Sequence, residues 1–224
     1  MNNGVLGSVA RIQEIGAQAA KVFIDRAELI DVIELALICG EHAIVLGPPG
    51  TAKSALVRYF AQALGQEFFR IVLNPDLPRE ELIGPINPSA LREGRWERAW
   101  AGLATCSIAF LDEIGKASPQ VMNLTLDAME ERKIRSGNTD RALPLHAMFS
   151  AANETINTES PAIWDRFTLR LVVRRVAEIS DFREMLNEAW GASSPPSVPI
   201  TLEELRAMRA ACLDMAAHAC QSRS

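Results

Sequence analysis

One segment of the chain, residues 47–54 with the sequence GPPGTAKS, constrains the fold more than any other. It follows a short apolar run at residues 42–46 and precedes a stretch of helical periodicity at residues 53–64. A glycine-rich turn between a buried strand and a helix directs consecutive backbone amides at an anion, where the helix dipole favours negative charge. The segment therefore predicts a phosphate-binding loop in an α/β fold.

Every residue of this loop is a candidate phosphate contact: Gly47, Pro48, Pro49, Gly50, Thr51, Ala52, Lys53 and Ser54. We expect Lys53 to reach the terminal phosphates of a nucleotide and the Ser54 hydroxyl to bind Mg²⁺. The pattern G-x-x-x-x-G-K-[ST] has glycine where this chain has Ala52. Alanine can begin a helix, so the chemistry of the loop survives if Ala52 has helical torsion angles. The alternative is a Gly-Pro turn followed by an ordinary amphipathic helix.

Two carboxylates, Asp112 and Glu113, end a second apolar run that starts at residue 107. They stand where a neighbouring strand would meet the phosphate loop. Asp112 can hold Mg²⁺ through its water shell, and Glu113 can polarise the water that attacks the γ-phosphate. Taken alone, the pair is equally consistent with a strand that ends in a solvated turn.

Short apolar runs also occur at residues 68–73, 146–151 and 169–173, separated by segments of helical periodicity. This alternation predicts βαβ units, a parallel sheet covered by helices on both faces, and ligands at the carboxyl ends of the strands. Two further helices are expected within residues 5–38. The segments 83–100 and 133–144 place turn residues between short extended stretches, and we expect inserted hairpins there.

The C-terminal part of the sequence divides into a linker and a helix. Residues 191–200 are rich in serine and proline, and Thr201 with Glu204 forms a capping box that predicts a final helix. We therefore expect a nucleotide-binding core with N-terminal helices at residues 1–190, a linker at 191–200 and a last helix at 201–224.

Composition narrows the class of protein. With 48% hydrophobic and 23% charged residues, the chain is typical of globular proteins rather than disordered or collagen-like ones. Its formal charge of −5 gives no overall basic field to attract nucleic acid. No run approaches the ~18 apolar residues of a membrane span, and the start lacks a secretory signal, so we expect a cytoplasmic protein. The spacing of the four cysteines predicts reduced thiols: Cys39, Cys106, Cys212 and Cys220.

Four segments in this order, GPPGTAKS, FLDEIGKASPQVMNLTLDAMEERKI, FSAANE and IWDRFTLR, resemble the MoxR family of AAA+ ATPases, nearest its RavA-like branch. The resemblance covers about residues 25–190. It implies a P-loop NTPase core with a five-stranded parallel sheet in the order 5-1-4-3-2. It also implies one hairpin inserted into the second helix, another before the fourth strand, and assembly into a ring, usually a hexamer. The two segments predicted as hairpins fall at those positions.

The resemblance also implies roles for two more residues. Asn153 in FSAANE corresponds to the sensor-1 residue that holds the attacking water or the γ-phosphate, although an asparagine here also suits a loop turn. Arg166 in IWDRF corresponds to the arginine finger, which acts on the nucleotide of a neighbouring subunit. Arg170 could share that role, or could form a structural salt bridge with Asp165 or Glu159.

Two other features of the family are less clear in this chain. Glu131 and Arg132 resemble a family motif near the subunit interface, but a solvated helix end fits them equally well. The family carries a helical lid with a sensor-2 arginine, and residues 201–215 resemble only its opening helix. Neither Arg206 nor Arg209 can therefore be assigned as sensor 2, and we expect the lid to be absent, truncated or supplied by a partner.

The predicted function is a ring ATPase that couples hydrolysis of ATP, with Mg²⁺ as cofactor, to chaperone-like remodelling of a protein partner. The resemblance implies a von Willebrand factor A (vWA) domain partner as well as a protein client. One alternative is a nucleotide-gated binding module with negligible turnover. A DNA-remodelling motor is less favoured because of the acidic balance. A cluster of basic and aromatic residues could stack on nucleic acid, grip a polypeptide or simply pack on a surface hairpin: Arg92, Arg95, Trp96, Arg98 and Trp100.

Overall fold

The computed structural model describes residues 3–136, 139–152, 161–180 and 194–221. Its main sheet consists of five parallel strands, in the spatial order β2-β3-β6-β1-β7. β4 and β5 form a separate sheet, so β6 and β7 are the fourth and fifth strands of the main sheet along the chain. Read from the β7 edge, the order of the main sheet is therefore 5-1-4-3-2, as predicted. The bounds of these strands are β1 (Ala43–Leu46), β2 (Phe68–Val72), β3 (Ile108–Asp112), β6 (Ala147–Ala152) and β7 (Leu169–Val172).

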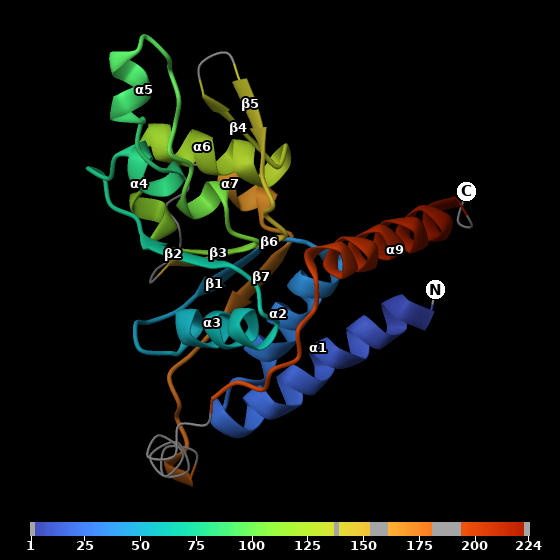
Figure 1. Cartoon of the computed structure of the whole chain (residues 1–224). Coiled ribbons are helices and arrows are strands. Elements are labelled where there is room, and N and C mark those ends of the chain that lie inside the picture. The colour runs from blue at the N-terminus through green and yellow to red at the C-terminus, as the bar shows by residue number, and fades with distance from the viewer. Residues whose placement is uncertain (1–2, 137–138, 153–160, 181–193, 222–224) are drawn as a thin grey trace.

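Helices cover both faces of this sheet (Figure 1). Side chains alternate between the faces along each strand, so Ala43 and Val45 pack into one core while Ile44 packs into the other. The first core lies under α1 (Asn3–Val22), α2 (Ala27–Cys39) and α3 (Lys53–Ala63). The second lies under α4 (Arg79–Ile83), α6 (Pro119–Glu130) and α7 (Pro161–Arg166). Two short 3₁₀ helices, η1 (Gly102–Ala104) and η2 (Ile114–Lys116), flank β3. The predicted layers are confirmed.

The two predicted hairpins fold differently from each other. β4 (Lys133–Ser136) and β5 (Thr139–Ala142) form the expected antiparallel pair. The segment 83–100 has only one antiparallel bridge, between Ile86 and Arg98, and carries the short helix α5 (Pro88–Arg92) at its tip. A plain hairpin is therefore wrong here. Asn87 accepts hydrogen bonds from the first helical amides and proline occupies the first turn, which together start a helix.

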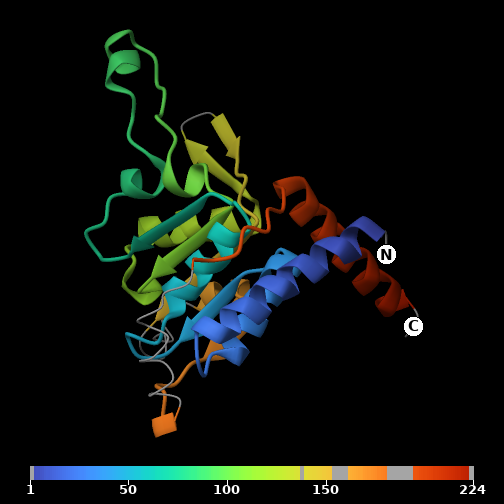
Figure 2. The ribbon, with the colours of Figure 1, turned by 60° about the horizontal axis from the view of Figure 1, so that its bottom comes forward.

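This inserted segment projects beyond the rest of the molecule (Figure 2). Its base is fixed by Trp100, whose ring lies 5.9 Å from the Arg98 guanidinium carbon and 5.0 Å from that of Arg141 on β5. At its tip, Arg95 forms ion pairs with Glu93 and Glu97. Trp96 is 79% exposed. Arg95, Arg98 and Trp100 therefore serve in local packing and charge pairing, whereas the Trp96 ring is exposed to solvent.

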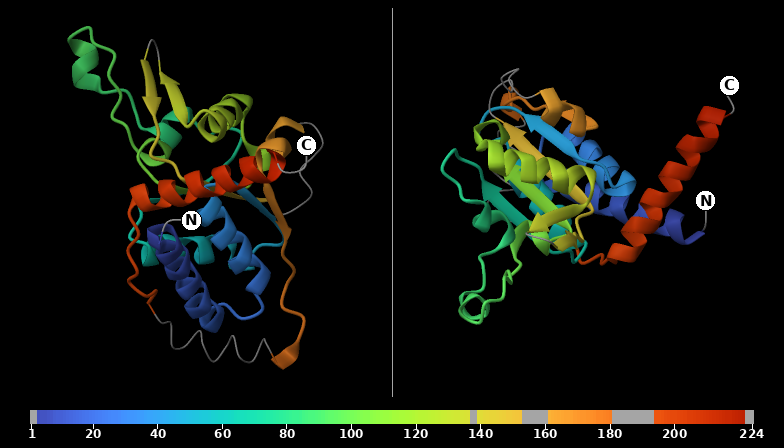
Figure 3. Two further views of the ribbon diagram at one scale, coloured as in Figure 1. Left: turned by 90° about the vertical axis from the view of Figure 1, so that its right-hand side faces the viewer. Right: turned by 90° about the horizontal axis from the view of Figure 1, so that it is seen from above.

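The last helix, α9 (Leu202–Gln221), packs against α1 and α2 (Figure 3). Its predicted capping box is confirmed, because the Glu204 amide donates to Thr201 Oγ1 at 3.2 Å and the Thr201 amide donates to Glu204 Oε2 at 2.8 Å. Leu205 and Met208 are buried in the core on that side. Glu204 also forms an ion pair with Arg11 of α1. The beginning and the end of the described chain are thus held together.

Two expectations concern the chain as a whole. Within the described ranges, no helix is both long and apolar enough to cross a bilayer. Cys39, Cys106 and Cys212 are free thiols, as predicted, and burial raises the pKa of Cys106 to about 12.

Candidate functional site

The phosphate loop and the acidic pair face the same cavity, which has a volume of about 220 Å³. It lies at the carboxyl edge of the sheet. Both β1, which precedes the loop, and β3, which ends in the carboxylates, are neighbours of β6, so parallel pairing brings their ends together. The residues lining the cavity are Pro49, Gly50, Thr51, Lys53, Ser54, Arg70, Phe110, Asp112 and Glu113.

The backbone of the loop depends on glycine at its start. A Cβ atom at Gly47 would lie 2.2 Å from the carbonyl oxygen of Val173, so no larger residue fits there. Gly50 has a φ of 80°, in the left-handed region. Ala52 also has a positive φ, 63°, and immediately precedes α3. Ala52 therefore does not have the torsion angles of a right-handed helix: the loop keeps the turn that glycine allows, and alanine adopts it at a steric cost.

Lys53 is buried at the start of α3 and folds over the loop. Its Nζ donates to the carbonyl oxygens of Gly47 at 2.6 Å and Pro48 at 3.0 Å. Burial lowers the pKa of Lys53, and the carboxylates of Asp112 and Glu113 oppose that shift. The ammonium group is thus placed between the loop and the acidic pair.

The two carboxylates have different surroundings. Asp112 accepts a hydrogen bond from Arg70 Nη2 of β2 at 3.2 Å. Glu113 has a φ of 57°, a strained value for a non-glycine residue, and its carboxylate lies 3.4 Å from Lys116 Nζ. Sequence analysis missed Arg70, although a charged residue inside the apolar run of β2 was a detectable signal.

The donor set of this cavity suits Mg²⁺. Ser54 and Asp112 supply a hydroxyl and a carboxylate, the hard oxygen donors that Mg²⁺ prefers, and this ion commonly keeps several waters. Across the described ranges, no group of three or more His, Cys, Asp or Glu residues is placed to hold a metal. These residues therefore fit a site in which Mg²⁺ is held by a few protein oxygens together with phosphate oxygens of the ligand.

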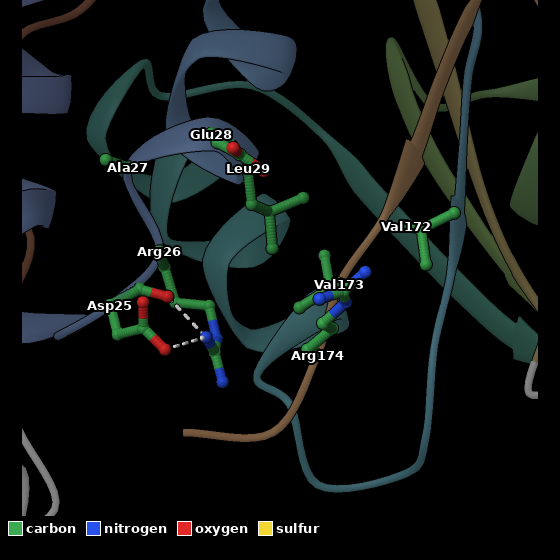
Figure 4. Close-up of a pocket in the computed structure, with 8 residues that line it drawn as sticks. All are labelled: Asp25, Arg26, Ala27, Glu28, Leu29, Val172, Val173 and Arg174. Carbon is green, nitrogen blue, oxygen red and sulfur yellow. Dashed lines mark hydrogen bonds and ion pairs between the residues drawn. The ribbon is translucent and has the colours of Figure 1, made fainter. Parts of the chain in front are cut away.

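A second cavity, of about 520 Å³, lies beside the loop and was not predicted from the sequence (Figure 4). It is formed where the α1–α2 turn meets the end of β7. The parallel pairing of β7 with β1 extends to this point through a hydrogen bond from Val173 N to Leu46 O at 2.7 Å. Arg26 lines this cavity and also contacts the phosphate loop, because its Nε donates to Thr51 O at 3.1 Å. The lining residues are Asp25, Arg26, Ala27, Glu28, Leu29, Val172, Val173 and Arg174.

The residues predicted to act between subunits have distinct positions. Asn153 lies outside the described residues. Arg166 is partly exposed at the end of α7, and its Nη2 lies 2.7 Å from Glu130 Oε2. Arg170 instead donates to the carbonyl oxygens of Phe167 and Trp164. Arg170 therefore stabilises the turn before β7.

Arg132 and the arginines of α9 lie at the amino ends of the strands, opposite the carboxyl ends where the phosphate loop lies. Arg132 is not a solvated helix end: it donates to the carbonyl oxygens of Gly40, Leu145 and His146. The side chain of Arg209 packs on Gly40, which precedes β1, whereas the phosphate loop follows β1. Arg206 lies near Arg132, and burial, together with the positive charges of Arg209 and Arg206, lowers the pKa of Arg132 to about 10. Arg206 and Arg209 are thus remote from the cavity of the phosphate loop.

The sheet order, the phosphate loop and the acidic pair define the class of this molecule, an α/β protein with an AAA+ core. Within that class, the chain belongs to the MoxR family. A family model described as the MoxR domain in the MoxR-vWA-beta-propeller ternary systems matches residues 10–210. The RavA-like branch is not tested by this match and stays a prediction.

Similar proteins agree with this family. Uncharacterized protein MJ0079 of Methanocaldococcus jannaschii is 32% identical, over 89% of this chain and 53% of its own length. Chaperone MoxR1 of Mycobacterium tuberculosis is 26% identical, over 76% of this chain and 46% of its own. A crystal structure of a candidate ATPase from Cytophaga hutchinsonii shares the fold, with a TM-score of 0.73, 20% identity, and coverage of 92% and 64%. The chain spans about half the length of these two curated relatives.

Proposed function

We propose that this chain binds Mg-ATP in the cavity between the phosphate loop and the acidic pair and hydrolyses it. The observation that carries the proposal is the convergence of Lys53, Ser54, Asp112 and Glu113 on one cavity. Each has the chemistry that phosphoryl transfer needs: a cation for phosphate, oxygen donors for the metal, and a carboxylate to polarise water. When bound, Mg²⁺ would neutralise charge that develops on the phosphates.

The side chains and the loop amides would have different roles in binding and hydrolysis. Lys53 would exchange the carbonyl oxygens it now contacts for phosphate oxygens, a short movement for a flexible side chain. Loop amides would bind the phosphates, and Glu113 would orient the attacking water. The larger cavity beside Arg26 has the volume to take the base and ribose of the nucleotide.

Ring assembly is part of the proposal. Arg166 would leave its exposed ion pair with Glu130 and contact the nucleotide of a neighbouring subunit, with Asn153 acting as sensor 1 within its own subunit. An exposed ion pair is weak, so this exchange costs little. A hexamer is the arrangement that the family resemblance implies.

We further propose that hydrolysis drives chaperone-like remodelling of a protein client together with a vWA-domain partner. The family description, which names MoxR-vWA-beta-propeller systems, and the relative named chaperone MoxR1 support this. A DNA motor is disfavoured, because the chain is acidic overall and Glu93 and Glu97 neutralise the charge of Arg95 at the tip of the inserted segment. A nucleotide-gated module without turnover remains the second candidate.

Phosphate release measured against protein concentration tests the proposal. In the wild type, specific activity should rise steeply with concentration, because each site needs a neighbour's arginine. Glu113→Gln should bind ATP without releasing phosphate, Lys53→Ala should lose both, and Arg166→Ala should bind ATP but stay inactive at every concentration. Arg170→Ala is the matched control, although its structural contacts require a check of folding.

Two outcomes would redirect the assignment. Normal hydrolysis by Glu113→Gln contradicts its role in polarising water. ATP binding by the wild type without phosphate release at any concentration supports the gated module instead.

A further inference from the structure

Arg26 is a buried cation that contacts the phosphate loop without belonging to it. The residue is only 8% exposed, in the turn between α1 and α2. Its Nη1 donates to the backbone and to the carboxylate of Asp25, the latter at 3.2 Å, while its Nε donates to Thr51 O at 3.1 Å. Burying a charged group is costly unless it is paired and hydrogen-bonded. The two ends of the guanidinium thus serve different partners, one of them in the loop.

The carbonyl that Arg26 holds lies at the bend of the loop. Thr51 is 3% exposed, and its hydroxyl donates to Pro48 O at 3.0 Å. The next residue, Ala52, has the left-handed φ of 63°, and α3 begins at Lys53. Because the peptide group is planar and trans, fixing the oxygen of Thr51 also fixes the direction of the Ala52 N–H. That amide opens the helix terminus at which anions bind.

We propose that Arg26 is a positioning residue that holds the phosphate loop in its anion-binding conformation through the Thr51 carbonyl. This role rests on the proposed function, since it concerns binding of the nucleotide's phosphates. Arg26 also lines the larger cavity, so one side chain connects the wall of that cavity to the loop. It acts on the phosphates through the backbone, without touching them.

The test compares two ligands, Mg-ATP and Mg-tripolyphosphate, by isothermal titration calorimetry. Tripolyphosphate has no base or ribose, so it reports on the loop alone. Arg26→Met should weaken both ligands by the same factor, on the order of tenfold or more, the usual effect of losing a hydrogen bond from a charged group. Arg11→Met is the matched control: it removes an ion pair of α1 with Glu204, and should bind both ligands like the wild type.

Three results would overturn the role. If Arg26→Met weakens ATP but not tripolyphosphate, Arg26 belongs to the larger cavity and does not position the loop. If both affinities are unchanged, the contact with Thr51 has no effect on binding. If the wild type itself binds neither ligand, the proposed function fails, and the role of Arg26 fails with it.

A second variant keeps the test decisive if Arg26→Met does not fold. Arg26→Lys keeps the charge, but its single ammonium group cannot replace two separate guanidinium nitrogens that contact Asp25 and Thr51 at once. We expect a smaller loss, again equal for the two ligands. Wild-type affinity for tripolyphosphate in Arg26→Lys would contradict the proposal.

Discussion

At the scale of single residues, Ala52 shows how a phosphate loop tolerates a missing glycine. Its φ of 63° is unfavourable for alanine. Ala52→Gly should therefore stabilise the protein by up to about 1 kcal/mol while keeping nucleotide affinity. Chemical denaturation with and without ATP measures both quantities. Ala55→Gly, at an exposed position of α3, is the control and should destabilise by roughly 0.5–1 kcal/mol. Equal losses in both variants would contradict the strained turn at Ala52.

Two buried histidines make the folded state sensitive to acid. His42 Nδ1 accepts from the Met148 amide at 3.0 Å and its Nε2 lies 3.1 Å from Met129 O, so the ring is neutral. Burial, aided by the charge of Arg132, lowers the pKa of His42 to about 3, and burial lowers that of His146 to about 4.

The sign of the effect follows from these shifts. Below pH 6.5 the unfolded chain binds protons that the folded protein does not, so stability present above pH 6.5 is lost as the pH falls toward 4. We expect a loss on the order of 3 kcal/mol between pH 7 and pH 5, measured by urea denaturation. His146→Gln should flatten this dependence, whereas the control His218→Gln, on the exposed side of α9, should not. An unchanged slope in His146→Gln would refute the assignment.

At the scale of elements, Arg132 connects the end of α2 to the start of β6. Its guanidinium donates to carbonyl oxygens of Gly40, Leu145 and His146. Arg132→Met would leave three acceptors without this donor and should cost roughly 3 kcal/mol or more of unfolding free energy. Arg135→Met, which removes an exposed pair with Glu131, should cost less than about 1 kcal/mol. Thermal melts of the two variants distinguish a buried connector from a solvated helix end, for which the losses would be equal.

The elements also show what the sequence could predict. The strands, α3, α9 and the β4–β5 pair have local signals, namely apolar runs, caps and turn residues, and their order along the chain places the loop beside Asp112. The roles of Arg26 and Arg132 had no such signal. Each arginine donates to backbone carbonyls distant from it in the sequence. Because any arginine can do so once packing brings carbonyls close, the sequence alone does not identify these two. The helix α5 had a local signal that was not used. Its cap and first-turn proline are visible in the sequence, but the turn residues of the segment favoured the prediction of a hairpin.

At the scale of the whole molecule, α9 packs on the side of α1 and α2, away from the phosphate loop. Arg206 is exposed there, beside Arg132. Arg206→Ala should therefore leave ATP affinity unchanged, whereas Lys53→Ala should abolish binding; titration with a fluorescent ATP analogue compares them. A marked loss of affinity in Arg206→Ala would mean that α9 reaches the nucleotide, as a sensor-2 helix does.

The contact between α9 and α1 also has a consequence for synthesis on the ribosome. Arg11 and Glu204, which pair across these helices, are 193 positions apart. At about 5–20 residues per second, roughly 10 to 40 s pass between their appearance. During that interval the apolar surface that Leu205 and Met208 later cover is open to other chains. Helix α1 is therefore made long before α9 can cover it, so contacts of its apolar face with other chains compete with folding during synthesis.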